Sequence, residues 1–295
     1  MRLPHAPWLD FAGLSDIGSV REENQDSIRL PAPGLPPERG LLYVLADGMG
    51  GLAQGKLAST LAADAMFESF YSAMRPIPRS LGQSVELANT RVLGAAQGAG
   101  STRMGTTLTA VCILGEEMWV AHVGDSRVYL VRDGAASLLT NDHTAVGDLV
   151  RMKLLSPDKV RTHAQRSMLN RAVGLGLFVR PDLTKTRLRE GDSVVICSDG
   201  LWSVVEDGEL GEMATASSEP ETLCAYLVDE AIARGSDDNV SVIAVRVSRR
   251  PPGGGDGPAP GLPRKGPLKS FFTRKAPTIL RPSSADIDSP RKERA

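Results

Sequence analysis

The sequence has 295 residues, a formal net charge of −1 and 41% hydrophobic residues, the composition of an ordinary globular protein. Because nucleic-acid binders usually carry a basic surplus, we expect no nucleic-acid partner. No apolar run reaches the length of a membrane span, so we expect no transmembrane segment. The N-terminal stretch MRLPHAPWLDFAGLSD lacks the apolar core of a signal peptide, and the three scattered cysteines suit a reducing compartment. These features predict a cytoplasmic protein.

The composition changes near Arg250. Residues 251–295 contain nine of the 20 prolines and nine Lys/Arg against four Asp/Glu. Such a segment cannot bury enough apolar surface to offset the entropy of ordering it. We therefore predict a folded domain over residues 1–250 and a disordered, Pro/Gly-rich basic tail over residues 251–295.

Short apolar runs bounded by Gly, Asp or Asn predict β-strands within the folded part. The expected strands are residues 41–46, 107–114, 118–123, 127–131, 193–197 and 240–247. The connections 115–117 and 124–126 are short enough for hairpins, which predicts antiparallel pairing. Helical spacing marks residues 53–71, 80–96 and 219–234. Helices grouped beside strand hairpins favour an α+β fold over a βαβ alternation.

Aspartates recur at the ends of these apolar strands. Asp47 follows LLYVLA, Asp199 follows VVIC, Asp125 lies in VAHVGDSRVYLV, and Asp238 precedes the last strand. Carboxylates brought together at strand ends are costly unless a cation compensates them, and Mg²⁺ and Mn²⁺ prefer such oxygen ligands. An Asp-Gly pair at a strand end is more often only a turn. From spacing alone, a metal site and a set of turns stay equally open.

Six segments in order carry a resemblance to a known family. They are SDIGSVREENQDS, ADGMGG, MGTTLTA, VGDSRVYL, CSDGLW and GSDDNVSVI, and they span about residues 9–247. In this order they resemble the metal-dependent protein phosphatase family of the protein phosphatase 2C type, in its compact prokaryotic form. The resemblance implies a central β-sandwich of two antiparallel sheets flanked by helices on both faces, a four-layer αββα arrangement.

The resemblance also implies roles for individual residues. Two Mn²⁺ or Mg²⁺ ions are expected, with the bridging Asp47 and with Gly48, Asp199 and Asp238 as ligands. The further positions that match the family are Asp26 as the acidic residue near the centre, Arg21 as the holder of the substrate phosphate, and Asp125 as the ligand of a weaker third metal.

The roles that the resemblance implies agree with the chemistry of metal-bound water and of the guanidinium group. Water shared by two close cations becomes a nucleophile at neutral pH, so no protein nucleophile is required. A guanidinium matches a phosphate with two parallel hydrogen bonds. Taken without the motif, Arg21 reads as a solvated charge in the stretch REENQD.

Two positions depart from the family pattern. Gln25 stands where many members carry glutamate, which removes a possible anionic ligand of the second metal. Ser203 stands where members often carry an acidic residue, which weakens the case for the third metal at Asp125.

Three histidines and one helical segment lie near these motifs. His143 and His163 fall in stretches that resemble the family's mobile flap, and an imidazole there can protonate a leaving oxygen; hydrogen bonding within a loop is the plainer alternative. His122 alternates inside a strand and is predicted to be structural. Residues 144–160 have helical spacing, which suits either a movable lid or a surface helix.

The sequence thus predicts a monomeric enzyme that dephosphorylates phosphoserine and phosphothreonine in proteins, including a Ser/Thr kinase. A competing interpretation is a family fold that has lost its metals and only binds phosphoproteins. The presence of Asp47, Asp199 and Asp238 argues against that interpretation. A phosphoesterase for small molecules stays open, because the same two-metal chemistry serves it.

Overall fold

A computed structural model of the chain describes residues 1–3, 5–50, 54–100 and 104–249. All of these residues fall within one compact unit, Met1–Arg264. The predicted tail, residues 251–295, lies outside the described residues. Within the described ranges, no helix combines the length and the apolar character needed to cross a membrane.

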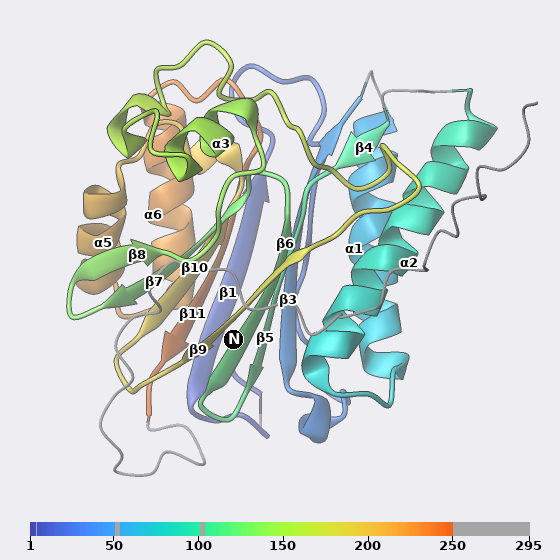
Figure 1. The fold of residues 1–295 in the computed structure, drawn as a ribbon. Helices are drawn as coiled ribbons and strands as arrows, with labels where there is room; N and C mark the ends of the chain where they lie inside the picture. The colour runs from blue at the N-terminus through green and yellow to red at the C-terminus, as the bar shows by residue number, and fades with distance from the viewer. Residues whose placement is uncertain (4, 51–53, 101–103, 250–295) are drawn as a thin grey trace, which may run out of the picture. The chain divides into compact units, whose positions relative to one another are not determined.

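Two antiparallel sheets form the centre of this unit (Figure 1). The five-stranded sheet has the order β1-β11-β10-β7-β8, with bounds Leu9–Asp16, Val240–Val247, Ser193–Cys197, Arg127–Arg132 and Ala135–Leu138. The six-stranded sheet has the order β2-β3-β5-β6-β9, with bounds Asp26–Arg29, Leu41–Met49, Leu108–Leu114, Glu117–Val123 and Asp182–Arg187. Its sixth strand, β4 (Gly105–Thr106), pairs with the end of β3.

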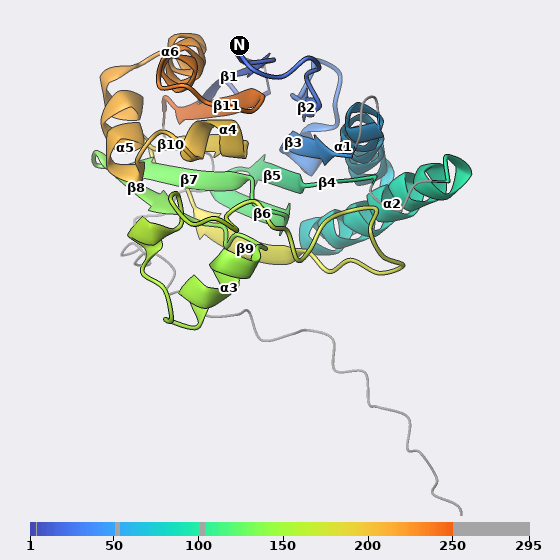
Figure 2. The ribbon, with the colours of Figure 1, turned by 90° about the horizontal axis from the view of Figure 1, so that it is seen from above.

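Helices cover the outer face of each sheet, as the view from above shows (Figure 2). The long helices α1 (Gln54–Ser72) and α2 (Ile77–Gly98) pack on the six-stranded sheet. The five-stranded sheet is covered by α4 (Asp199–Trp202), α5 (Asp207–Ala216) and α6 (Pro220–Ala233). The remaining helices are α3 (Ala145–Arg151) and the 3-10 turns η1 (Pro37–Arg39) and η2 (Pro157–Lys159).

Strand β3 shows why the apolar runs become buried strands. Leu42, Val44 and Ala46 point into the core under α1 and α2. The alternate residues, including Tyr43 and Leu45, point into the core between the two sheets. Because side chains alternate across a strand, a strand buried on both faces is a continuous apolar run, as LLYVLA is. A third core lies between the five-stranded sheet and the helices α4 to α6.

The structure confirms the predicted α+β sandwich with helices on both faces. Residues 193–197 and 240–247 are strands with the predicted bounds, and the 115–117 connection joins the paired strands β5 and β6. The predicted hairpin at 124–126 is wrong. There the chain leaves β6, which pairs with β5 and β9, and enters β7, which pairs with β10 and β8 in the other sheet.

Five strands were not predicted: β1, β2, β4, β8 and β9. Strand β4 has only two residues, and each of the other four mixes polar and apolar residues and includes partly exposed positions, so none stands out as an apolar run. The segment 144–160, predicted to have helical spacing, is helical only over α3 and the short turn η2.

A buried histidine pair lies where the chain crosses between the sheets. The His122 ring is hydrogen-bonded to Thr109 Oγ1 at 2.9 Å and to the Asn141 carbonyl at 3.2 Å. Its ring centroid lies 4.8 Å from that of His143. Burial, reinforced by His143, lowers the pKa of His122 to about 3, although Asp182 opposes this change. His122 therefore stays neutral in the folded protein.

This lowered pKa makes the fold sensitive to acid. Since the unfolded chain binds a proton at His122 below pH ~6.5 and the folded chain does not, stability falls as the pH drops from about 6.5 towards 3. We expect His122→Gln to remove roughly 2–3 kcal/mol of the stability lost by the wild type between about pH 7 and pH 4.5. Urea unfolding at a series of pH values measures this difference. Parallel curves for the two proteins would contradict it.

Candidate metal centre

Pairing between β2 and β3 brings two of the predicted site residues together. Asp26 begins β2, and the strand register places it directly opposite Asp47. Strand β3 does not end before Asp47, as the sequence suggested, but continues to Met49 because Gly48 and Met49 pair with β4. Asp47 and Gly48 are thus held by strand pairing at one end of the six-stranded sheet.

Two threonines that the sequence analysis did not single out fix this end of β3. The hydroxyl of Thr107 accepts a hydrogen bond from the Asp47 backbone nitrogen at 2.9 Å. The Thr106 hydroxyl and the Thr107 backbone nitrogen both donate to the Asp47 carbonyl at 2.8 Å. Thr107 Oγ1 also lies 2.9 Å from Ser126 Oγ, beside Asp125. The motif MGTTLTA was the available signal for these threonines.

The other sheet supplies two more carboxylates through adjacent strands. Asp199 is the first residue of α4, just after β10, and Asp238 lies just before β11, the neighbour of β10. Asp125 lies in the crossover between β6 and β7, where its carbonyl accepts a 2.9 Å hydrogen bond from Trp202 Nε1. Trp202 ends α4, so this short helix links Asp125 to Asp199.

Burial and mutual repulsion raise the pKa of these carboxyl groups. The pKa of Asp26 rises to about 7 through burial, with Asp199 and Asp238 adding to the effect and Ser241 and Ser198 opposing it. Burial and the charge of Asp238 raise the pKa of Asp199 to about 6. For Asp47, burial and the charges of Asp26, Asp199, Asp125 and Asp238 place the pKa well above its ordinary value.

The pKa of Asp125 is also raised well above its ordinary value, with burial as the main cause and Asp199 as the largest contributing charge. The five carboxyl groups therefore interact electrostatically although they come from distant parts of the sequence. An arrangement of this kind is costly without a compensating cation.

The Arg21 guanidinium lies at this cluster. It donates to Asp238 Oδ2 at 2.7 Å and to the Asp237 carbonyl at 3.1 Å. About half of the Arg21 side chain is exposed, so it is also accessible to a ligand.

Asn239 fastens the loop that carries Arg21. Its side-chain oxygen accepts from the Gln25 backbone nitrogen at 2.8 Å. Its side-chain nitrogen donates to the carbonyls of Ile17 and Glu23 at 2.9 and 3.1 Å. Asn239 directly follows Asp238 in the motif GSDDNVSVI, and these hydrogen bonds give its physical task.

Gly48 fits a narrow space between three segments. A Cβ atom at this position would lie 2.0 Å from the Gly55 carbonyl oxygen and 2.8 Å from the Gln25 carbonyl oxygen. Because backbone atoms cannot yield as a flexible side chain does, only glycine fits there. The Gln25 side chain approaches the same space, since its Oε1 would lie 2.1 Å from a Cβ on Gly55.

The donor set at this cluster fits a hard divalent cation. Asp26 Oδ2 and Asp199 Oδ1 are buried and have no hydrogen-bond partner among the described residues. Carboxylate oxygens of this kind are the ligands that Mg²⁺ and Mn²⁺ prefer. Within the described ranges, no group of three or more His, Cys, Asp or Glu side chains lies close enough together to form a complete ligand shell. Mutual repulsion and the pairing of Asp238 with Arg21 both act against closer approach.

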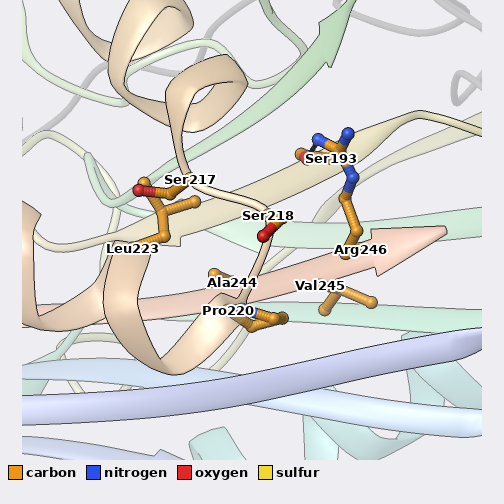
Figure 3. A pocket seen from close by; sticks show the side chains of 8 residues that line it. All are labelled: Ser193, Ser217, Ser218, Pro220, Leu223, Ala244, Val245 and Arg246. Atoms are coloured by element: carbon orange, nitrogen blue, oxygen red, sulfur yellow. Dashed lines mark hydrogen bonds between the residues drawn. The ribbon is translucent and has the colours of Figure 1, made fainter. Parts of the chain in front are cut away.

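A polar cleft of about 130 Å³ opens beside the cluster. It is lined by Arg21, Arg166, Ser167, Asp199, Trp202, Ser203, Asp237 and Asp238. His163 is not among the residues that line it. A second cavity, drawn in Figure 3, lies on the outer side of the five-stranded sheet, where Arg246 Nη1 donates to Ser193 Oγ at 2.7 Å. With about 10 Å³ of space, that cavity has room for at most one water molecule.

The role of Asn239 can be tested by its removal. Asn239→Ala removes the hydrogen bonds that the Asn239 side chain makes to the backbone groups of Ile17, Glu23 and Gln25, so we expect a loss of roughly 2–3 kcal/mol in the free energy of unfolding. Asn170→Ala is the matched control, because Asn170 is exposed and its side chain bonds to Asp148 at the surface. Urea denaturation measures both. Equal, small effects would show that Asn239 does not fasten the loop.

Comparison with known proteins gives the context of this site. The family model described as protein phosphatase 2C matches residues 19–230. The chain is 35% identical over 243 residues to the serine/threonine protein phosphatase PstP of Mycobacterium tuberculosis, covering 81% of this chain and 45% of PstP. It is 27% identical over 244 residues to the protein phosphatase PhpP of Streptococcus pneumoniae, covering 81% of this chain and 98% of PhpP.

A solved structure extends the comparison to three dimensions. The PstP catalytic domain in complex with two manganese ions superposes with a TM-score of 0.70 at 33% identity, covering 81% of this chain and 97% of that domain. The predicted family and the predicted activity are both confirmed, since PstP is a serine/threonine protein phosphatase, PhpP is a protein phosphatase, and the region that the family model matches contains nearly all of the carboxylate cluster. The chain is thus a serine/threonine protein phosphatase, and it belongs to the protein phosphatase 2C family.

Proposed function

We propose that the chain hydrolyses phosphoserine and phosphothreonine of proteins at the cleft beside Arg21, Asp199 and Asp238, with two divalent cations held by the carboxylate cluster. The observation that carries this proposal is the set of buried, mutually repelling carboxyl groups from both sheets. Their raised pKa values mark a charge arrangement that a cation would relieve.

Asp47, Asp199 and Asp238, with the carbonyl of Gly48, would hold the two ions. Bound Mn²⁺ or Mg²⁺ would neutralise charge on the phosphoryl group and lower the pKa of water enough to supply the nucleophile. The PstP structure with two manganese ions supports manganese as one usable metal. Asp125 would hold a third ion weakly, because Ser203 adds no charge to that position.

Arg21 and Asp26 would act on the substrate and the water. The Arg21 guanidinium, which pairs with Asp238, would turn part of its donor set towards a phosphate in the adjoining cleft. Asp26, whose Oδ2 lacks a hydrogen-bond partner among the described residues, would accept a proton on that oxygen or orient water there.

We also propose which substrates the enzyme meets and where in the cell it acts. Phosphorylated Ser and Thr are the products of Ser/Thr kinases, so a kinase that carries such groups is itself a candidate substrate. Cys112, Cys197 and Cys224 are buried and unpaired, which supports a cytoplasmic location. We propose that the chain acts there as a monomer in phosphorylation-dependent signalling.

Removal of a ligand tests the metal centre. We expect hydrolysis of a phosphothreonine peptide to require added Mn²⁺ or Mg²⁺ and to stop with chelator. Asp47→Asn should lower turnover by roughly a hundredfold or more. The metal-free variant should remain folded, because the change removes one of several repelling charges.

Calorimetric titration with Mn²⁺ should show two tight sites and a weaker third in the wild type, with a tight site lost in Asp47→Asn. Asp64→Asn, which alters a carboxylate paired with Arg29 on the surface, is the control and should match the wild type. Near wild-type turnover in Asp47→Asn would refute the site.

Substitution of Arg21 tests phosphate binding. Arg21→Ala should raise KM for the phosphopeptide by roughly tenfold or more, while the affinity for Mn²⁺ changes little or rises because Asp238 loses a competing partner. Arg91→Ala removes an exposed arginine paired with Glu68 and serves as the control. If KM and kcat are unchanged in Arg21→Ala, Arg21 is only a surface charge.

Truncation tests the proposed domain boundary. The carboxylate cluster and the final strand β11 all precede residue 250. We therefore propose that residues 1–250 form the catalytic domain and expect a chain ending at Arg250 to hydrolyse a small aryl phosphate at the rate of the full chain. Its melting temperature should also be unchanged. A fall in either quantity would place part of residues 251–295 in the folded domain.

A further inference from the structure

A long segment in the connection from β8 to β9 borders the catalytic cleft. We call residues 145–169 the flap segment; it contains α3 and η2 (Figure 1). Its two ends are tied together by a β-bridge between Thr144 and Leu169 and by a hydrogen bond from the Ala145 nitrogen to the Met168 carbonyl at 3.1 Å. Closing the base of the segment does not fix the direction in which the rest of it lies.

Arg161 supplies a second attachment, in the middle of the segment. Its Nε donates to the Trp202 carbonyl at 2.8 Å, and its Nη2 donates to the Val205 carbonyl at 3.2 Å and to Asp207 Oδ1 at 2.7 Å. Its Nη1 lies 3.2 Å from Glu206 Oε2. The Arg161 side chain is only 12% exposed. A guanidinium with this many acceptors and so little exposure is a fixed contact and not a solvated charge.

One acceptor of Arg161, the Trp202 carbonyl, belongs to the helix that carries Asp199, and the others follow it in the connection to α5 and at the first residue of α5. Trp202 is the last residue of α4, which starts at Asp199. The Trp202 indole donates to the Asp125 carbonyl, and its ring lies 3.8 Å from the guanidinium carbon of Arg127. Arg127 in turn forms a buried ion pair with Asp142. Asp142 lies two residues before Thr144, whose β-bridge to Leu169 closes the base of the flap segment. Arg161 is therefore docked on a platform that is itself immobilised.

The flap segment also contributes to the cleft. Arg166 and Ser167 line it together with Arg21 and Asp238. They follow Arg161 by only a few residues, and the Arg166 nitrogen continues this turn with a hydrogen bond to the His163 carbonyl at 3.1 Å. The contacts of Arg161, together with the burial of Val146 and Val160 in the core under α4 to α6, hold the part of the flap segment that leads to Arg166 and Ser167.

We propose that Arg161 is a positioning residue: it fastens the flap segment to the α4–α5 connection, so that Arg166 and Ser167 form a fixed wall of the cleft for a phosphorylated protein segment. The inference rests on the proposed function, because it assigns the wall to the phosphopeptide substrate. Without the Arg161 contacts, the flap segment is docked in only a fraction of the molecules. The apparent affinity for a ligand that needs the docked flap segment then falls in proportion to that fraction.

Amide hydrogen exchange of the metal-free protein tests the anchoring itself. In Arg161→Ala, peptides from the flap segment should exchange at least about tenfold faster than in the wild type, because the docked fraction falls. Arg234→Ala is the matched control. Arg234 contacts the Val204 carbonyl on the same connection and Glu209 in the first turn of α5, but it comes from the end of α6 and not from the flap segment. Unchanged flap exchange in Arg161→Ala would overturn the proposal.

Steady-state kinetics with Mn²⁺ tests the effect on substrate. KM for a phosphothreonine peptide should rise about tenfold in Arg161→Ala with kcat nearly unchanged, whereas KM for a small aryl phosphate should rise less than about threefold, because the small substrate does not extend along the flap. Arg161→Lys should be intermediate, since lysine keeps the charge without the planar set of donors. If Arg161→Ala does not fold, as judged by its melting temperature, Arg161→Lys is compared with the wild type on the same two substrates. Equal changes for both substrates would overturn the proposed wall.

The two measurements separate this inference from the proposed function. A wild-type protein that hydrolyses neither substrate would refute the phosphatase mechanism and, with it, the substrate wall. The exchange result would still decide whether Arg161 anchors the flap segment, because it requires no metal and no turnover.

Discussion

Repulsion among clustered buried and half-buried carboxylates is the constraint on which the rest of this structure depends. Asp26 and Asp47 face each other across β2 and β3, and Asp125, Asp199 and Asp238 approach from the crossover and from the second sheet. Placing these groups together works against folding unless they are neutralised or bound to a cation. The raised pKa values of Asp26, Asp47, Asp125 and Asp199 express that cost. The same cost is what makes the cluster suited to hard metal ions.

The surrounding structure holds the carboxylates in place through backbone contacts. Thr106 and Thr107 fix the backbone of Asp47, and Asn239 fixes the loop that precedes Asp26. Trp202 connects the crossover at Asp125 with the helix that begins at Asp199. These polar side chains bond to main-chain atoms and not to the carboxylate oxygens, and Asp26 Oδ2 and Asp199 Oδ1 have no hydrogen-bond partner among the described residues. These two oxygens are therefore available to a ligand.

Polar contacts to the backbone also hold the flap segment, which lines the cleft proposed for the substrate. Arg161 uses one buried guanidinium to attach a long connection to the platform behind Asp199. Arg21 from the first loop and Arg166 from the flap segment line the same cleft, together with Asp199 and Trp202 of the short helix α4. A change in the anchor would alter substrate recognition while the carboxylate cluster stays intact, which separates recognition from chemistry within one cleft.

The sequence by itself determined the layers, the family and the residue types of the site. A strand buried on both faces must be a continuous apolar run, and this is why residues 41–46, 193–197 and 240–247 were recognised. The half-exposed strands β1, β2 and β9 carry mixed patterns and were missed. The motifs named Asp26, Asp47, Asp125, Asp199 and Asp238, and the structure brings their charges within interacting range.

Tertiary structure alone decided the pairings between distant segments. The short connection at 124–126 joins two sheets and not two neighbouring strands, because partners for β6 and β7 come from β9 and β10, far along the chain. The pairing of Arg21 with Asp238, the fastening by Asn239 and the anchoring by Arg161 each join groups from different elements. The local sequence pattern indicates which face of an element is buried, but it does not indicate to which distant acceptor a polar side chain will donate a hydrogen bond. That choice follows from how the two sheets and their connections pack.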